Sequence, residues 1–252
     1  MCAAPAIDSG GGGVSPEESE QSLDLSTYAH RQLIGYLGLL LPVLLYGLAG
    51  VRGTAELPAW KLLDSVSAYY YSGAVAVFVG VLFGLGFFLL TYQGYSDSRA
   101  DRRLGRFAAL CAFAIAIFPT GSAPDHIPRP EWWGGAAGSI HYIAAALLFT
   151  SFAVFSLWLF RRTDVPEGEP LPPDKRFGNR VYAVCGTVII ACILWAGASR
   201  IRPHPIFWPE TIALWAFALS WLVKGRAHHT LASAARRVKA TVQRAGRSSS
   251  AS

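Results

Sequence analysis

The chain has 252 residues, of which 52% are hydrophobic and only 15% are charged, whereas charged residues make up about 25% of a typical soluble domain. This composition excludes a disordered chain and argues against a soluble domain, so we expect one integral membrane domain with short polar ends. The net charge of +6 would indicate nucleic acid in a soluble protein, but here Lys and Arg cluster at the ends of apolar segments. That placement predicts anionic lipid headgroups as the partner and no nucleic acid.

The two ends of the chain are predicted to be polar tails. Residues 1–30 contain a glycine run and an acidic cluster and lack the basic region and apolar core of a secretory signal peptide, so we expect a disordered cytoplasmic tail. Residues 226–252 are basic and end in serines. They are predicted to be either a weak amphipathic helix that lies on anionic lipids or a basic stop signal followed by a disordered end.

Six apolar segments between residues 31 and 225 predict an all-α fold, an integral membrane bundle of six transmembrane helices. A helix needs about 20 apolar residues to cross a bilayer core. The third and sixth segments are shorter than this, so their ends are the least sharply defined. The expected spans are about 33–51, 72–92, 107–120, 140–160, 181–198 and 211–223.

The distribution of Lys and Arg predicts the orientation of this bundle. With six spans, both tails and the loops 93–106 and 161–180 share one side, and that side holds 17 of the 22 basic residues. The three opposite loops hold the other five. Because basic loops stay in the cytoplasm, we expect both termini to be cytoplasmic.

The second apolar segment is unusually long and uneven in composition. Between Asp64 and Asp97 lie 32 uncharged residues, and the first part, SVSAYYYSG, carries hydroxyls and three consecutive tyrosines. This part is expected to be a polar, aromatic entrance at the outer membrane face. Further on, Gly80 and Gly84 form a GxxxG pair on one helical face, where another helix can approach closely. We expect packing within the bundle, with a homodimer through this pair as the alternative.

Unusual polar residues gather in three stretches that this topology places on the outer side. Histidines, carboxylates and hydroxyls on one rim could act as acids and bases or enclose the polar part of a ligand. The candidate catalytic residues are His141, Asp64, Asp125 and His126. The candidate ligand-binding residues are Ser67, Tyr70, Trp133, Arg200, His204 and Glu210.

Each candidate also has a structural interpretation. Asp64 and Ser65 are suitable N-caps for the second helix, and Glu210 follows a proline in the first turn of the sixth, where the helix dipole favours a carboxylate. The Trp and Tyr residues fit an interfacial belt. His141 differs because it lies about one turn inside the fourth helix, and ionisable residues at that depth are often functional. A hydrogen bond to Ser67 or to a tyrosine would satisfy it equally well.

Several motifs expected of other membrane proteins are missing from the sequence. The span centres carry no Asp, Glu, Lys or Arg, which argues against proton pumps, ion-coupled transporters and retinal pigments. No HxxxH or HExxH spacing is present, so no metal ligand and no cofactor is assigned. A G-x-S-x-G nucleophile motif is also missing.

Four short elements follow one another across residues 65–225: SVSAYYYSG, IFPTG, GSIHYIAAALLF and FWPETIALWAFALSWLVKG. In this order they resemble an uncharacterised bacterial multi-pass membrane family, a domain of unknown function that is loosely similar to DRAM/Frag-like six-helix proteins. The resemblance implies a six-helix bundle in a bacterial inner membrane and implies no reaction. The Ser, Asp and His residues near helix ends are also similar to those of ceramidase-like membrane hydrolases, but the paired histidines in a late helix of that family are missing here.

Two functions are compatible with these observations. The first is a non-enzymatic inner-membrane protein whose outer-face pocket binds a lipid or another amphiphile. The second is a membrane-embedded lipid hydrolase or transferase that uses His141 with nearby Asp or His residues and, in one version, zinc. The apolar span centres argue against a third class, a channel or carrier.

Overall fold

A computed structural model describes residues 16–51, 60–94, 98–121, 133, 135–163, 166, 169–199 and 204–226, with side chains of the first helix described from residue 27. This part of the chain is helical and contains no strand. The elements in order are α1 (Pro16–Val51), η1 (Ser67–Tyr71), α2 (Val75–Leu90), α3 (Arg99–Ile117), α4 (Gly135–Leu157), η3 (Leu159–Arg161), α5 (Pro173–Ala198) and α6 (Phe207–Lys224).

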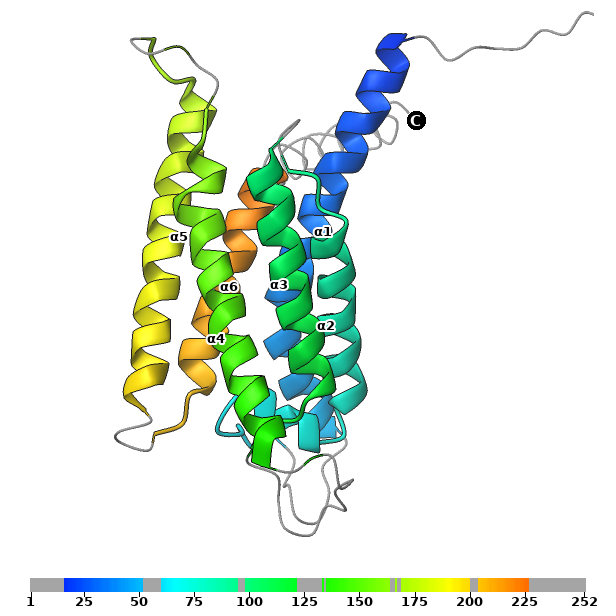
Figure 1. Ribbon diagram of the computed structural model, residues 1–252, viewed down its shortest axis with the longest axis vertical. Helices are drawn as coiled ribbons and strands as arrows, with labels where there is room; N and C mark the ends of the chain where they lie inside the picture. The colour runs from blue at the N-terminus through cyan, green and yellow to red at the C-terminus, as the bar shows by residue number, and fades with distance from the viewer. Residues whose placement is uncertain are drawn as a thin grey trace, which may run out of the picture.

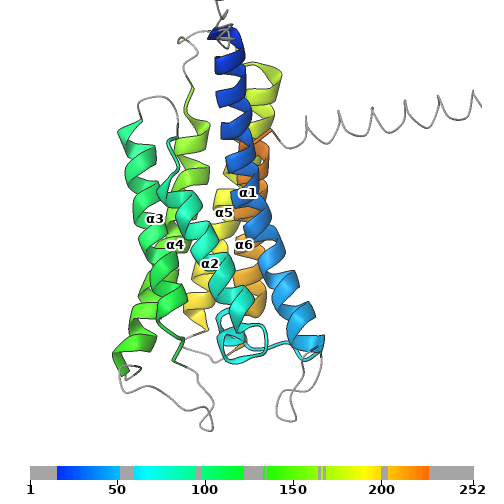
Figure 2. The ribbon, with the colours of Figure 1, turned by 90° about the vertical axis from the view of Figure 1, so that its right-hand side faces the viewer.

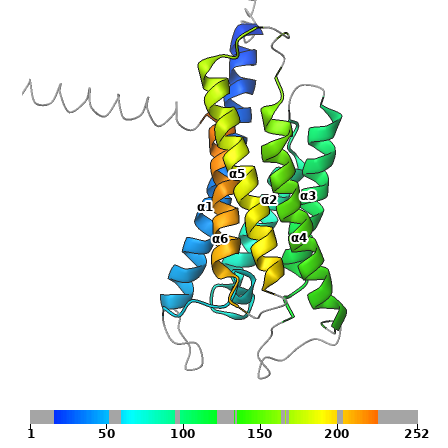
Figure 3. The same cartoon turned by 90° about the vertical axis from the view of Figure 1, so that its left-hand side faces the viewer.

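The six α-helices form a closed ring in chain order. Each helix packs against the next one in the sequence, and α6 packs against α1, which closes the ring. The helices run side by side along the long axis of the molecule (Figures 1 and 2), and Figure 3 shows α6 between α1 and α5. Helix α4 also contacts α6 across the ring.

The two ends of the ring differ in chemistry. The basic end, at the top of Figure 1, holds the ends of α2, α4 and α6 and the beginnings of α3 and α5. The polar-aromatic end, at the bottom, holds η1 and the beginnings of α4 and α6. Among the described basic residues, Lys61 lies at the polar-aromatic end, and the others lie at or toward the basic end: Arg31, Arg99, Arg102, Arg103, Arg106, Arg161, Arg162, Lys175, Arg176, Arg180, Lys224 and Arg226.

The helices α1, α3 and α5, which begin toward the basic end, start well before the predicted spans, whereas α4 and α6, at the other end, start only a few residues early. Helix α3 begins at Arg99 because Ser98 caps it, with the Ser98 hydroxyl accepting the N–H of Asp101 at 3.3 Å. Helix α5 begins at Pro173, a residue that suits the first turn of a helix. Helix α1 begins at Pro16, so helical structure covers part of the segment predicted as a disordered tail.

Aromatic side chains fill the interior of the ring. The rings of Phe152 and Phe217 stack with centroids 3.6 Å apart, and Trp221 lies against Tyr92 and Phe160 at 4.8 and 5.0 Å. Polar contacts inside this core include a hydrogen bond of 2.9 Å from the Ser156 to the Ser220 hydroxyl. The described interior is therefore a packed aromatic core.

Glycines allow the close approach of α2 and α3, but at a position other than the predicted pair. A Cβ on Gly105 would lie 2.7 Å from the main-chain oxygen of Leu89. At Gly80, no described atom lies within 4 Å of a Cβ, and at Gly84 the nearest is a Leu37 methyl at 3.7 Å. The prediction that the pair packs within the bundle is therefore wrong for Gly80, whereas Gly84 lies against α1, and the homodimer stays a prediction.

Three helices are long and apolar enough to cross a membrane: Thr27–Val51, Ala136–Arg161 and Pro173–Ala198. Helix α2 is apolar but shorter, with 16 residues. Large apolar side chains face outward on the long helices, including Leu33, Leu40, Val43, Ile143, Val184 and Leu194. The chain thus has the helix lengths and the apolar outer surface of a membrane protein.

Candidate functional site

The polar stretch before α2 folds as a short 3-10 helix, η1, and not as the beginning of α2. The Ser65 hydroxyl accepts the N–H of Ala68, in the first turn of η1, at 2.9 Å. Helix α2 begins later, at Val75, where residue Ala74 provides no side-chain cap. The prediction that Asp64 and Ser65 cap the second helix is therefore wrong, because the turn of η1 lies between these residues and the beginning of α2.

Glu210 holds this turn against the beginning of α6. Its Oε2 accepts the main-chain N–H of Val66 at 2.6 Å. The main-chain oxygen of Asp64 in turn accepts the N–H groups of Ile206 and Phe207 at 2.6 and 2.9 Å. Glu210 precedes the apolar run 211–223, and burial raises the pKa of its carboxyl to about 7, although N–H groups of the η1 segment lower it. The carboxyl therefore links two segments that are distant in sequence.

His141 is enclosed by the bundle, with an exposed fraction of 1%. Its Nδ1 lies 2.7 Å from the main-chain oxygen of Phe118, just after the end of α3. Because a carbonyl oxygen only accepts, Nδ1 carries the proton and donates to it. The partner is thus a main-chain carbonyl group just past the end of α3, and not the expected Ser67 or tyrosine hydroxyl.

Three half-buried aromatic residues lie together beside η1, and we call Tyr70, Tyr71 and Trp133 the aromatic group. The ring centroids are 5.4 Å apart for Tyr70 and Tyr71, 5.9 Å for Tyr70 and Trp133, and 6.5 Å for Tyr71 and Trp133. All three pairs are edge-on, with interplanar angles of 68°, 71° and 70°. Burial raises the pKa of the Tyr70 phenol, so this hydroxyl stays neutral.

Hydrogen bonds fix the aromatic group to α3 and α4. The Tyr71 hydroxyl donates to the main-chain oxygen of Thr120 at 2.5 Å. The Thr120 hydroxyl donates to the hydroxyl of Tyr142, which follows His141 in α4, at 3.1 Å. Tyr71, Thr120 and Tyr142 therefore belong to the site, although none of them is among the candidate site residues predicted from the sequence.

The structure brings some of the predicted site residues together and separates others. Ser67, Tyr70, Trp133 and Glu210 lie on or against η1. His141 contacts Phe118, whereas Asp64 is exposed and contributes its main-chain oxygen to the contact with α6. The side chain of His204 is exposed. The remaining candidates, Asp125, His126 and Arg200, lie outside the described residues.

The described side chains at this end place aromatic rings and hydroxyls next to one another. Among the described residues, no three His, Cys, Asp or Glu side chains are placed to hold a metal ion. Comparisons of the chain with protein-family models, with curated proteins and with solved structures found no match.

Proposed function

We propose that the chain crosses the membrane six times, with both termini on the cytoplasmic side of a bacterial inner membrane, as its resemblance to the multi-pass family implies. The closed ring supports six spans, because α2 and α3 lie between α1 and α4, and α6 lies between α5 and α1. Helices packed between membrane-spanning neighbours share their depth in the bilayer. The basic end faces the cytoplasm because of its Lys and Arg residues.

Exposed tryptophans at both ends of the bundle support the same position of the helices in the bilayer. Trp208 and Trp195 lie at or near the polar-aromatic end, and Trp158 lies at the basic end, each with about half of its surface exposed. Tryptophan is enriched at both membrane interfaces. A reporter enzyme that is active only in the periplasm tests this topology when fused after Val223. An inactive fusion is expected, and an active one contradicts the six-span arrangement.

The function that the geometry supports best is binding of a lipid or another amphiphile at the polar-aromatic end. The aromatic group carries this proposal, since three rings in edge contact, half-buried and tied to Thr120, make a preorganised apolar surface beside hydroxyls. Aromatic rings with polar tips suit the boundary between headgroups and acyl chains. Enclosure of His141, with Nδ1 already donating to Phe118, favours binding over the alternative of lipid hydrolysis or transfer.

Binding can be measured by native mass spectrometry of the purified protein titrated with a bilayer lipid extract. We expect defined lipid adducts on the wild-type protein and about tenfold weaker binding for Trp133→Ala, which corresponds to about 1.4 kcal/mol. Trp208→Ala is the matched control, because Trp208 is an exposed tryptophan at the same end that lies outside the aromatic group. Equal losses in the two variants would contradict the proposal.

A further inference from the structure

Four basic residues from α1, α5, the last turn of α6 and the turn after it gather at the basic end, and we call Arg31, Lys175, Lys224 and Arg226 the basic cluster. Of the four charged groups whose field acts most on Lys224, three are the other members of this cluster and one is the carboxylate of Asp101. Burial and these cations together lower the pKa of Lys224, which follows the apolar run 211–223, to about 7. Repulsion among the cations therefore exceeds the attraction of Asp101.

Arg31 is the buried member of the basic cluster, with an exposed fraction of 9%. Its Nη2 donates to the main-chain oxygen of Gly94 at a long 3.4 Å, and its Nε has no hydrogen-bond partner among the described atoms. The guanidinium lies 5.9 Å from the ring centroids of both Tyr28 and Tyr92. A buried guanidinium with N–H donors left over is costly unless an anion pairs with it.

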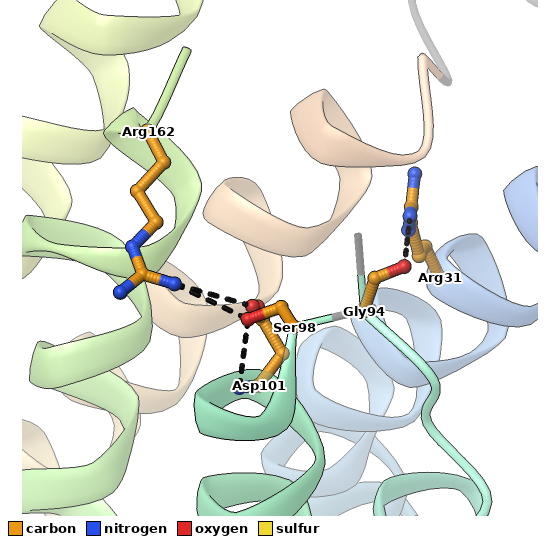
Figure 4. Close-up of polar contacts among 5 residues, drawn as sticks. All are labelled: Arg31, Gly94, Ser98, Asp101 and Arg162. Atoms are coloured by element: carbon orange, nitrogen blue, oxygen red, sulfur yellow. Dashed lines mark hydrogen bonds and ion pairs between the residues drawn. The ribbon is translucent and has the colours of Figure 1, made fainter. Parts of the chain in front are cut away.

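The carboxylate among the charged groups that act on Lys224 is that of Asp101, and it already pairs with Arg162. Asp101 is buried, its Oδ2 lies 3.8 Å from Nη1 of Arg162, and the same Arg162 nitrogen donates to the Ser98 hydroxyl at 3.2 Å. Figure 4 shows that Asp101 and Ser98 turn toward Arg162, while Arg31 stands apart on the side of Gly94. Asp101 therefore pairs with Arg162, and among the described residues no carboxylate is in direct contact with the Arg31 guanidinium.

Fixed contacts hold the other members of the basic cluster in place. Lys175 donates to the main-chain oxygens of Phe160, at 3.1 Å, and of Arg162. The Lys224 ammonium lies 5.4 Å from the ring centroid of Phe160, and the Arg226 guanidinium 4.9 Å from that of Tyr28. Arg31, Lys224 and Arg226 thus lie near aromatic rings, and Lys175 is bound to main-chain oxygens.

We propose that the basic cluster binds a phosphoryl anion at the level of the lipid headgroups, with Arg31 as its central ligand. A phosphoryl group offers several oxygens and one or two negative charges, which match the fork of a guanidinium and adjacent ammonium groups. An orientation signal needs only exposed Lys and Arg, so it does not account for a buried Arg31 with an unpartnered Nε. This site lies at the opposite end from the aromatic group and does not depend on the function proposed for it.

The test measures thermal unfolding of the full-length protein in a neutral detergent with added sodium phosphate, against sodium chloride at equal ionic strength. A second arm places the protein in nanodiscs of phosphatidylglycerol or of phosphatidylcholine. Stabilisation by inorganic phosphate identifies an open phosphate site. Stabilisation only in phosphatidylglycerol identifies the phosphate of an anionic lipid. No stabilisation in either arm overturns the proposal.

Variants connect this effect to the basic cluster. Arg31→Gln is expected to weaken the apparent affinity by about tenfold or more, because it removes the charged hydrogen-bond donors closest to the bound anion. Arg226→Gln, at an exposed position of the cluster, is expected to weaken it less and carries the test if Arg31→Gln does not fold. Arg103→Gln, an exposed arginine of α3 outside the cluster, is the matched control for loss of charge. An equal loss in Arg103→Gln would show a diffuse charge effect and overturn the proposal.

Discussion

The main-chain N–H of Val66 donates a hydrogen bond of 2.6 Å to Oε2 of Glu210, although 144 residues separate them in sequence. This bond joins the turn that holds the aromatic group to the beginning of α6. The orientation of η1, and with it the position of Tyr70, therefore depends on a carboxyl group of a distant helix.

Removing the Glu210 carboxyl is expected to destabilise the polar-aromatic end. Glu210→Ala leaves the Val66 N–H without its acceptor, which costs about 1–3 kcal/mol. Glu210→Gln keeps an acceptor oxygen and should cost less. Thermal unfolding in detergent measures both, with Asp64→Ala as the control, because Asp64 contributes a main-chain oxygen and not its side chain. A Glu210→Ala protein as stable as Asp64→Ala would contradict this role.

Stability is expected to pass through a minimum near pH 7. The pKa of Glu210 rises from 4.5 to about 7, so between these values the folded protein keeps a proton that the unfolded chain releases, and the free energy of unfolding falls as pH rises. The pKa of Lys224 falls from 10.5 to about 7, so above pH 7 the unfolded chain binds the extra proton and the free energy of unfolding rises with pH.

Two variants separate the limbs of this profile. Glu210→Gln should flatten the fall below pH 7, and Lys224→Gln should flatten the rise above it. The measurement is the unfolding temperature of each protein at a series of pH values. If both variants keep the wild-type profile, other groups control the pH dependence.

Close packing of α2 on α3 predicts that two glycine substitutions differ in their effect on the free energy of unfolding. Gly105→Ala places a methyl group 2.7 Å from the Leu89 main-chain oxygen, and relieving this clash should cost about 1–3 kcal/mol. Gly80→Ala adds a methyl group where no described atom lies within 4 Å and should be neutral or slightly stabilising, because alanine favours helix. Thermal unfolding compares the two. A large loss at Gly80 would instead indicate the homodimer contact.

His141 is expected to stabilise the fold through its hydrogen bond to the Phe118 main-chain oxygen. His141→Ala removes the N–H donor and leaves a void in a buried position, so we expect a loss of about 2 kcal/mol or more. Metal analysis of the purified wild-type protein, for which we expect no stoichiometric zinc, provides the contrast. Zinc at one ion per chain that disappears in His141→Ala would favour the enzyme alternative.

The sequence predicted the apolar part of each helix but not where each helix begins. An apolar run such as 107–120 indicates which residues lie in an apolar environment. The helix α3 begins earlier, at Arg99, because Ser98 and Asp101 form its first capped turn. This capping pattern involves residues close together in the sequence, so the sequence alone could have predicted it. The 3-10 turn of η1 was harder to predict, since serine and tyrosine residues fit several backbone conformations equally well.

Long-range partners account for the rest of the difference. Glu210 was expected at a helix beginning and lies there, but a main-chain N–H such as that of Val66 has no signature in the sequence. The same holds for His141, where side-chain hydroxyls were the expected partners and the main-chain oxygen of Phe118 is the observed one. Side-chain chemistry can be read from a sequence, whereas the main-chain groups that meet it depend on the fold.

Cross-linking with a photoactivatable phospholipid, followed by mapping of the modified residues by mass spectrometry, tests the proposed function most directly. We predict that modification concentrates on the aromatic group, at Tyr70, Tyr71 and Trp133, and that excess unlabelled lipid suppresses it there. Modification spread evenly over outward-facing residues of the long helices, such as Val43 and Leu194, with no enrichment at the aromatic group, would contradict the proposal.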